Sequence, residues 1–121
     1  MATRKTSIKP SPFPEPKPPG ISVLILAAGV GKRMHSRASK LAHNLAGKPM
    51  VRYVVDAAIA LGAQRVLVVV GSQSEEVRQA VGSKDPRVSF CVQEQPLGTG
   101  HAVLSAEKAL RGVEGTLLIL N

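Results

Sequence analysis

The feature that most constrains the fold is an alternation of short, unbroken apolar runs with segments of helical periodicity, which begins at Ser22. Unbroken apolar runs are typical of parallel strands that are buried on both faces. Between these runs, apolar residues recur every three or four positions, which predicts amphipathic helices. With right-handed crossovers, this alternation predicts an α/β fold, a Rossmann-like three-layer α/β/α sandwich with a mostly parallel sheet.

The predicted order is βαβαβαβ, with strands at 23–27, 65–70, 88–92 and 116–120 and helices at 49–61, 75–81 and 99–110. Ser72-Gln73-Ser74-Glu75 has the pattern of a capping box for the second helix. The last strand stops where open parallel sheets usually place their ligand groups. We therefore expect an incomplete sheet, the N-terminal part of a larger domain.

Residues 1–19 differ from the rest because six of them are prolines, which lack the backbone donors that helices and sheets require. We predict a disordered, basic, proline-rich tail at 1–19 and a folded unit at 20–121. The apolar run after the tail is too short to cross a membrane, and the tail is not a compact basic leader. A single cysteine, Cys91, lies in an apolar run, which favours a small buried residue and a reducing, cytoplasmic location.

The formal charge of +8 is concentrated in part of the chain. Residues 29–55 hold six basic side chains and no acid: Lys32, Arg33, Arg37, Lys40, Lys48 and Arg52. The only aromatic residues are Phe13, Tyr53 and Phe90, so platforms for base stacking are essentially absent. This distribution favours a small polyphosphate over a nucleic acid as the partner.

A glycine-rich, basic loop follows the first predicted strand. Gly29 and Gly31 allow a ligand to approach the backbone, Arg33 offers a planar fork of donors, and Lys40 supplies a mobile charge. It is not a Walker loop, because Leu26 and Arg33 occupy positions that require glycine and a hydroxyl residue. Met34 likewise excludes the dinucleotide-binding fingerprint. The loop predicts a phosphate site of another kind, and the alternative is a tight turn with solvated surface charges.

A second unusual loop covers residues 93–98, at the same predicted edge of the sheet. The amide of Gln93 can donate and accept, as recognition of a base edge requires, although a surface glutamine would look the same. Gly98-Thr99-Gly100 offers backbone N–H groups at a helix start, either for a ligand or for ordinary capping. The three histidines lack metal-ligand spacing, and no acid stands at a predicted strand end.

Three stretches together resemble the sugar-phosphate nucleotidyltransferases, and most closely the uridyltransferase domains of bifunctional N-acetylglucosamine-1-phosphate uridyltransferase/glucosamine-1-phosphate acetyltransferases. They are Leu26–Met34, Ser39–Met50 and Gln93–Ala102. The first stretch is shared across the superfamily, whereas the second and third are more specific for the uridyltransferases. The departures are Lys32, where the family usually has threonine, and Ser39, where it usually has proline.

The resemblance implies transfer of UMP from UTP to N-acetylglucosamine 1-phosphate, with release of pyrophosphate. It implies catalytic roles for Arg33 and Lys40, which would neutralise the phosphates. It also implies a set of substrate-binding residues: Leu26, Ala27, Ala28, Gly29, Gly31, Gln93, Gly98, Thr99 and Asn121. Gln93, Gly98 and Thr99 would read the uracil, and Asn121 stands where the family has a tyrosine before Gly-Asp.

The resemblance further implies Mg²⁺ as cofactor, with its ligands expected beyond Asn121 and none in this chain. A homo-oligomer formed through a C-terminal domain is expected for the parent, while residues 1–121 alone are expected to be inactive. Two alternatives stay open. One is another nucleotidyltransferase, such as a guanylyl- or cytidylyltransferase, and the other is a non-catalytic nucleotide-binding module.

Overall fold

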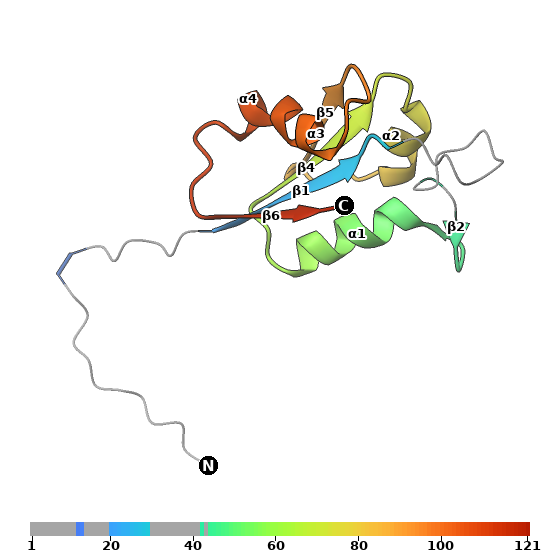
Figure 1. The fold of residues 1–121 in the computed structure, drawn as a ribbon. Coiled ribbons are helices and arrows are strands. Elements are labelled where there is room, and N and C mark those ends of the chain that lie inside the picture. The colour runs from blue at the N-terminus through green and yellow to red at the C-terminus, as the bar shows by residue number, and fades with distance from the viewer. Residues whose placement is uncertain (1–11, 14–19, 30–41, 43) are drawn as a thin grey trace, which may run out of the picture.

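A parallel sheet forms the centre of the computed structural model, which describes residues 12–13, 20–29, 42 and 44–121 (Figure 1). Its strands lie in the order β5-β4-β1-β6. Their bounds are β1 Ile21–Ala27, β4 Arg65–Gly71, β5 Val88–Gln93 and β6 Thr116–Leu120. All three strand pairings are parallel. The predicted α/β fold and the strand–helix order are confirmed.

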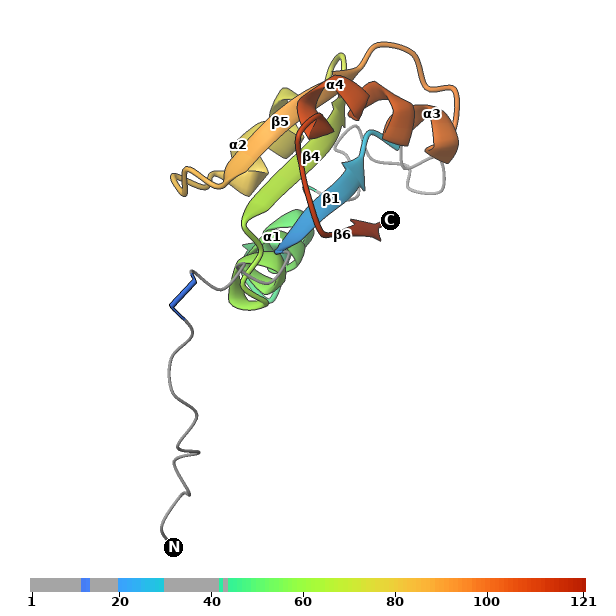
Figure 2. The ribbon, with the colours of Figure 1, turned by 90° about the vertical axis from the view of Figure 1, so that its left-hand side faces the viewer.

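Helices cover both faces of this sheet, as two views at right angles show (Figures 1 and 2). On one face lie α1, Met50–Ala60, and α2, Glu75–Val81. On the other face lie α3, Thr99–Ser105, and α4, Glu107–Leu110. The apolar runs supply a buried side chain to each face in turn, because successive residues of a strand point to opposite sides.

Two apolar clusters result from this alternation. The first lies between the sheet and helices α1 and α2, where Val23, Ile25 and Ala27 of β1 pack with Val55 and Val77. The second lies between the sheet and α3, where Leu24 and Leu26 pack with residues that include Leu67, Ala102 and Ala106. The core is densest under β1 and β4, whereas the edge strand β6 leaves its central residues about two-fifths exposed.

The connection between the first predicted strand, 23–27, and the predicted helix at 49–61 ends in a small hairpin that periodicity did not predict. It pairs β2, Asn44–Leu45, with β3, Lys48–Pro49, in antiparallel register. The two turn residues, Ala46 and Gly47, have φ angles of 52° and 81°, the left-handed conformation that a two-residue hairpin turn requires. Pro49 consequently belongs to the hairpin and is the N-cap of α1, so the predicted helix start is one residue too early.

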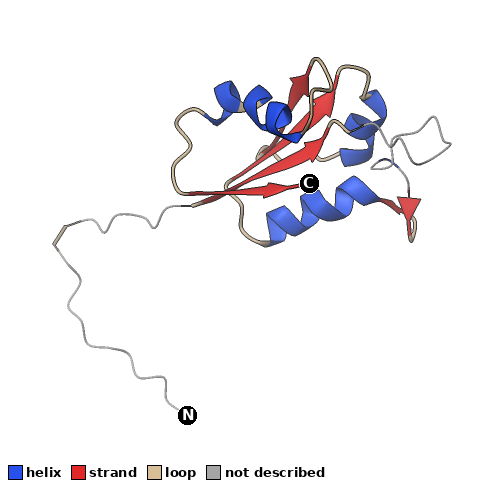
Figure 3. Ribbon diagram, in the orientation of Figure 1, coloured by secondary structure: helices blue, strands red, loops and turns tan. Residues whose placement is uncertain are grey.

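The predicted capping box of α2 is wrong. Ser74 is the N-cap, yet its side chain makes no capping hydrogen bond. Its hydroxyl donates instead to the carbonyl oxygen of Gly71 at the end of β4. Figure 3 shows how short this helix is beside α1. The serine hydroxyl therefore stabilises the strand-to-helix turn.

The predicted helix at 99–110 is interrupted at Ala106 and forms α3 and α4. The Ser105 hydroxyl donates to the carbonyl oxygen of His101 at 2.9 Å, and the Cys91 thiol donates to the carbonyl oxygen of Ser105 at 3.2 Å. Side chains that bond helix carbonyls in this way bend helices. Cys91 is half-buried rather than buried, and burial raises the pKa of its thiol.

The predicted tail at 1–19 lies outside the described residues except for residues 12 and 13. Among the helices that are described, none has the length and apolarity needed to cross a membrane.

Candidate functional site

Three strands end at one edge of the sheet, and their last residues form a row. Ala27 of β1 is paired with Val70 of β4, which places Ala28 beside Gly71. Gly71 is in turn paired with Gln93 of β5. Two strand spacings separate Ala28 from Gln93, or about 10 Å. The strand arrowheads in Figure 1 point to this edge, near which β2 and the start of α1 also lie. The ends of β1 and β5, from which the two unusual loops leave, thus lie at one edge of the sheet, as predicted.

Gly71 lies in the middle of this row, although it was not singled out from the sequence. A Cβ built at this position would lie 3.6 Å from the Ala28 carbonyl oxygen, the one contact within 4 Å among the described residues. The backbone between Ala28 and Gln93 is therefore not covered by a side chain at Gly71. The available signal was a glycine that directly ends the apolar run of β4.

The β1 residues predicted to hold the nucleotide are placed at the end of that strand. Leu26 and Ala27 are buried, while Ala28 is half-buried and Gly29 is exposed. The pairing of β1 with β6 ends at Ile25 and Leu120, so Leu26 and Ala27 pair with β4 alone. Among the described residues, none lies within 4 Å of a Cβ built at Gly29. Ala28 and Gly29 are thus the accessible residues at this end of β1, and the role predicted for residues 26–29 stays a prediction.

The remaining predicted residues of the basic loop are not placed by the structure. Gly31, Arg33 and Lys40 lie outside the described residues, and their roles stay predictions. Asn121 is exposed and directly follows β6, which borders β1 on the side away from β4. Asn121 therefore lies beside Leu26, on the side of β1 opposite to β4 and Gln93, and its role stays a prediction.

Gln93 is a buried strand residue rather than the loop residue that was predicted. Gln93 is the last residue of β5, and only 5% of its surface is exposed. The amide nitrogen Nε2 donates to the carbonyl oxygen of Gly98 at 3.3 Å and lies 2.8 Å from Nδ1 of His101. The predicted pair of Gln93 and Gly98 is thus in direct contact.

Gly98 shapes the loop that follows. Its φ of 100° and ψ of 177° are a conformation that side-chain-bearing residues rarely adopt. Its carbonyl oxygen also accepts a hydrogen bond from the Ala102 amide at 3.0 Å, which ties the loop to α3. Thr99 begins α3 and is exposed, and no side chain caps this helix.

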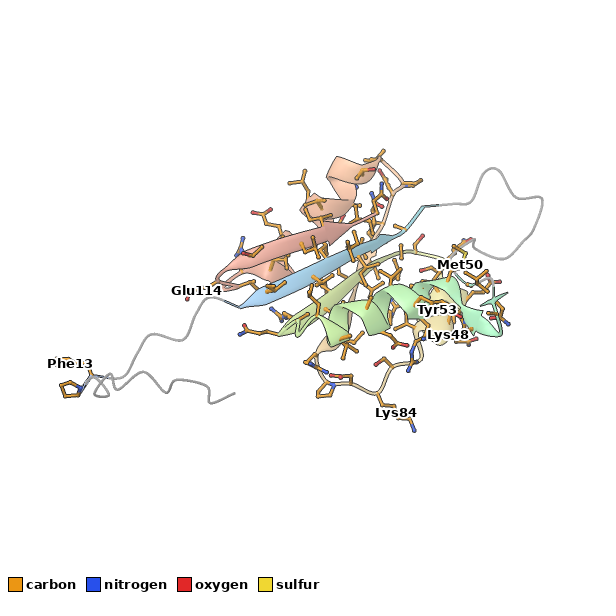
Figure 4. All side chains as sticks on the ribbon, turned by 90° about the horizontal axis from the view of Figure 1, so that it is seen from below. Phe13, Lys48, Met50, Tyr53, Lys84 and Glu114 are labelled. Atoms are coloured by element: carbon orange, nitrogen blue, oxygen red, sulfur yellow. The ribbon has the colours of Figure 1, made fainter. Side chains whose placement is uncertain are left out.

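The hairpin before α1 is fastened to that helix by polar contacts. The Tyr53 hydroxyl donates to the Leu45 carbonyl oxygen at 2.8 Å. Lys48 Nζ lies 2.5 Å from Asp56 Oδ2 and 4.4 Å from the centre of the Tyr53 ring. Figure 4 labels Lys48 and Tyr53 side by side. Arg52 donates to Asp56 at 3.1 Å and to the Val81 carbonyl oxygen at 2.6 Å, which extends the contact to α2.

Replacing Asp56 with alanine is expected to shift the amide NMR signals of residues 44–48 and to lower the free energy of unfolding by less than about 1 kcal/mol, because the pair is partly solvated. The hydrogen bond from Lys48 holds the pKa of Asp56 below its usual 3.8. The contribution is therefore complete above pH 3.8 and is lost as the pH falls through the lower value. Glu114→Ala, at an exposed residue outside the hairpin, is the control. Equal effects of the two variants would contradict the contact.

The described residues do not fit a magnesium site. No group of three or more His, Cys, Asp or Glu side chains among them is arranged to hold a metal ion. The expectation that no acid stands at a strand end is corrected, because β5 reaches Gln93 and Glu94 follows directly. Glu94 is exposed and is a single carboxylate, whereas Mg²⁺ in phosphoryl-transfer sites is held by carboxylates together with substrate phosphates.

Comparison with known proteins agrees with this architecture. Residues 23–120 match the family described as the MobA-like NTP transferase domain. The chain belongs to this family. A curated relative of this transferase domain, the bifunctional protein GlmU of Anaeromyxobacter dehalogenans strain 2CP-C, is 48% identical over 103 residues. The GlmU of Thermoanaerobacter pseudethanolicus is 50% identical over 101 residues.

In both comparisons the aligned region is 84% of this chain and 21% of the relative, so this chain spans about a fifth of the relatives' length. Among solved structures, HddC from Yersinia pseudotuberculosis complexed with GMP-PN is 25% identical, with a TM-score of 0.65 over 83% of this chain and 47% of that one. A putative glucose-1-phosphate thymidylyltransferase from Bacillus anthracis is 19% identical and shares the fold, with a TM-score of 0.68 over 76% of this chain and 40% of that one.

Proposed function

We propose that this chain is the UTP-binding part of an enzyme that transfers UMP to N-acetylglucosamine 1-phosphate. The observation that carries the proposal is the row of Ala28, Gly71 and Gln93 at the C-terminal edge of the sheet. It combines accessible backbone at β1 with a buried amide at β5, and ligands of open α/β sheets bind at this edge. The high identity to two proteins named GlmU supports the choice of reaction.

In the proposed reaction, a phosphate oxygen of the sugar phosphate attacks the α-phosphorus of UTP. The new O–P bond forms as the bond to the β-phosphate oxygen breaks, and pyrophosphate leaves with that electron pair. No protein nucleophile is required, so catalysis rests on positioning and on stabilisation of charge. The end of β1 would orient the nucleotide, while Arg33 and Lys40 would offset the phosphate charge.

Magnesium belongs to the proposal only as a general property of nucleotidyl transfer, since it would neutralise the phosphates when bound. The residues described here do not form its site, and none of them is assigned to it. A cytoplasmic location and assembly into a homo-oligomer likewise stay predictions.

Replacing Gln93 with alanine is expected to weaken UTP binding by about tenfold, because one hydrogen bond to the base is lost. Binding is measured by titrating the ¹⁵N-labelled 121-residue chain with UTP. Gln79→Ala is the matched control, since Gln79 is an exposed glutamine of α2. Unchanged affinity in the Gln93 variant, with a wild-type-like spectrum, would remove Gln93 from the site.

Assays with UTP, GTP and CTP separate the uridyltransferase from a guanylyl- or cytidylyltransferase. The non-catalytic alternative predicts nucleotide binding without pyrophosphate release in a protein that contains the entire domain. For residues 1–121 alone we expect no transfer, and uridyl transfer by a pure, monodisperse sample would refute that expectation.

A further inference from the structure

We propose that His101 is a positioning residue that fixes the orientation of the Gln93 amide and thereby selects the base. The site would favour bases whose recognition edge carries a ring N–H, such as uracil and guanine, over cytosine and adenine, which present a bare ring nitrogen there. This inference rests on the proposed nucleotide site and names a residue that sets its specificity.

The first step is the orientation of the Gln93 amide. Its nitrogen lies 3.3 Å from the carbonyl oxygen of Gly98, an atom that can only accept a hydrogen bond. A flipped amide would place its oxygen against this carbonyl, which is repulsive. One hydrogen of Nε2 is therefore assigned to Gly98.

The second hydrogen of the Gln93 amide nitrogen fixes the tautomer of the His101 ring. Nδ1 of His101 lies 2.8 Å from the Gln93 amide nitrogen. Nδ1 must accept the hydrogen bond, because an amide nitrogen can only donate. The imidazole is then neutral, with its proton on Nε2 of the ring. Two hydrogen bonds hold the backbone around His101. The Ser105 hydroxyl donates to the His101 carbonyl oxygen, and the Ala102 amide donates to the Gly98 carbonyl oxygen.

The third step concerns the amide oxygen of Gln93. Both hydrogens of the amide are occupied, and no hydrogen bond to Oε1 is found within the described part of the chain. Gln93 is only 5% exposed, and buried acceptors are normally hydrogen-bonded. Its amide oxygen is therefore available to a donor on a bound ligand. A ring N–H would satisfy it, whereas a bare ring nitrogen would set two lone pairs against each other.

Without His101, the longer bond to Gly98 is the one bond among the described residues that would orient the amide. The flipped orientation would then become accessible and would offer a donor to cytosine or adenine. Discrimination between bases would fall even if overall binding persisted. An ordinary packing role for His101 predicts a different result, namely equal weakening for all nucleotides.

The experiment compares the wild-type chain with His101→Leu and His101→Asn. The asparagine oxygen stands at the same number of bonds from Cα as histidine Nδ1 and can accept from Gln93. Affinities for UTP and CTP, and for GTP and ATP, are measured by NMR titration of the 121-residue chain. We expect the ratio of UTP to CTP affinity to fall about tenfold in the leucine variant and to be largely restored in the asparagine variant.

An unchanged ratio in a folded leucine variant that still binds UTP overturns the inference and leaves the proposed function intact. Failure of the wild-type chain to bind any of the four nucleotides counts against the proposed function and hence against the inference that rests on it. A separate measurement on the ligand-free wild type needs no variant to fold. Long-range ¹H–¹⁵N spectra must show a bare Nδ1 and a protonated Nε2 in His101, and a proton on Nδ1 overturns the inference by itself.

Discussion

Replacing Leu24 with alanine is expected to lower the free energy of unfolding by about 3 kcal/mol, because it leaves a cavity in a closely packed layer. Leu24 lies at the middle of β1 and is fully buried. It packs in the cluster between the sheet and α3, where its neighbours include Leu67, Ala102 and Ala106. None of the small alanines opposite can fill the space of the lost side chain.

Urea unfolding followed by circular dichroism measures this loss. Leu104→Ala is the matched control, because Leu104 lies on α3 and is 66% exposed. Substitutions at such surface positions usually change stability by less than about 0.5 kcal/mol. Similar losses in both variants would contradict the described packing of α3 against the sheet.

Replacing Arg33 with alanine is expected to lower turnover of UMP transfer about a hundredfold in a protein that contains this chain and the rest of the domain. The reason is the loss of a fixed cation that would stabilise charge on the phosphates as the pyrophosphate bond breaks. The prediction rests on the sequence, since Arg33 lies outside the described residues. Steady-state rates with UTP and N-acetylglucosamine 1-phosphate measure it.

Arg111→Ala is the control for the change in net charge. Arg111 is exposed and follows α4, on the connection that leads to the start of β6 and away from the C-terminal edge of the sheet. Its loss should leave turnover unchanged. A near-normal rate in the Arg33 variant would exclude this residue from the mechanism.

The secondary structure was largely predictable because most of it is encoded locally. The apolar runs of β1, β4, β5 and β6 are legible as buried strands, and the observed bounds differ from the predicted ones by at most two residues. One error is the β2–β3 hairpin, which depends on the positive φ angles of Ala46 and Gly47. Two others lie where a side chain bonds to a carbonyl elsewhere. Ser74 donates to Gly71 instead of capping α2, and Ser105 and Cys91 take part in the contacts at the break between α3 and α4.

The loops that carry the candidate site could be predicted from the sequence, whereas most contacts between its residues could not. Gln93 and Gly98 were expected to act near each other, and they are hydrogen-bonded. Gly71 was not expected, because only the register of β4 between β1 and β5 places it in the row. His101 was noted only as a histidine without metal-ligand spacing, and its contact with Gln93 depends on how the 94–98 loop returns to α3.

By itself, the sequence determined the strand–helix alternation, the glycine-rich basic loop and the motifs that indicate the family, because these are patterns of neighbouring residues. Only the tertiary structure decided which atoms meet at the edge of the sheet. The row through Ala28, Gly71 and Gln93 follows from strand order and register. The fixed Gln93 amide follows from a turn with positive φ at Gly98, and such geometry depends on packing between segments that are separate in the chain.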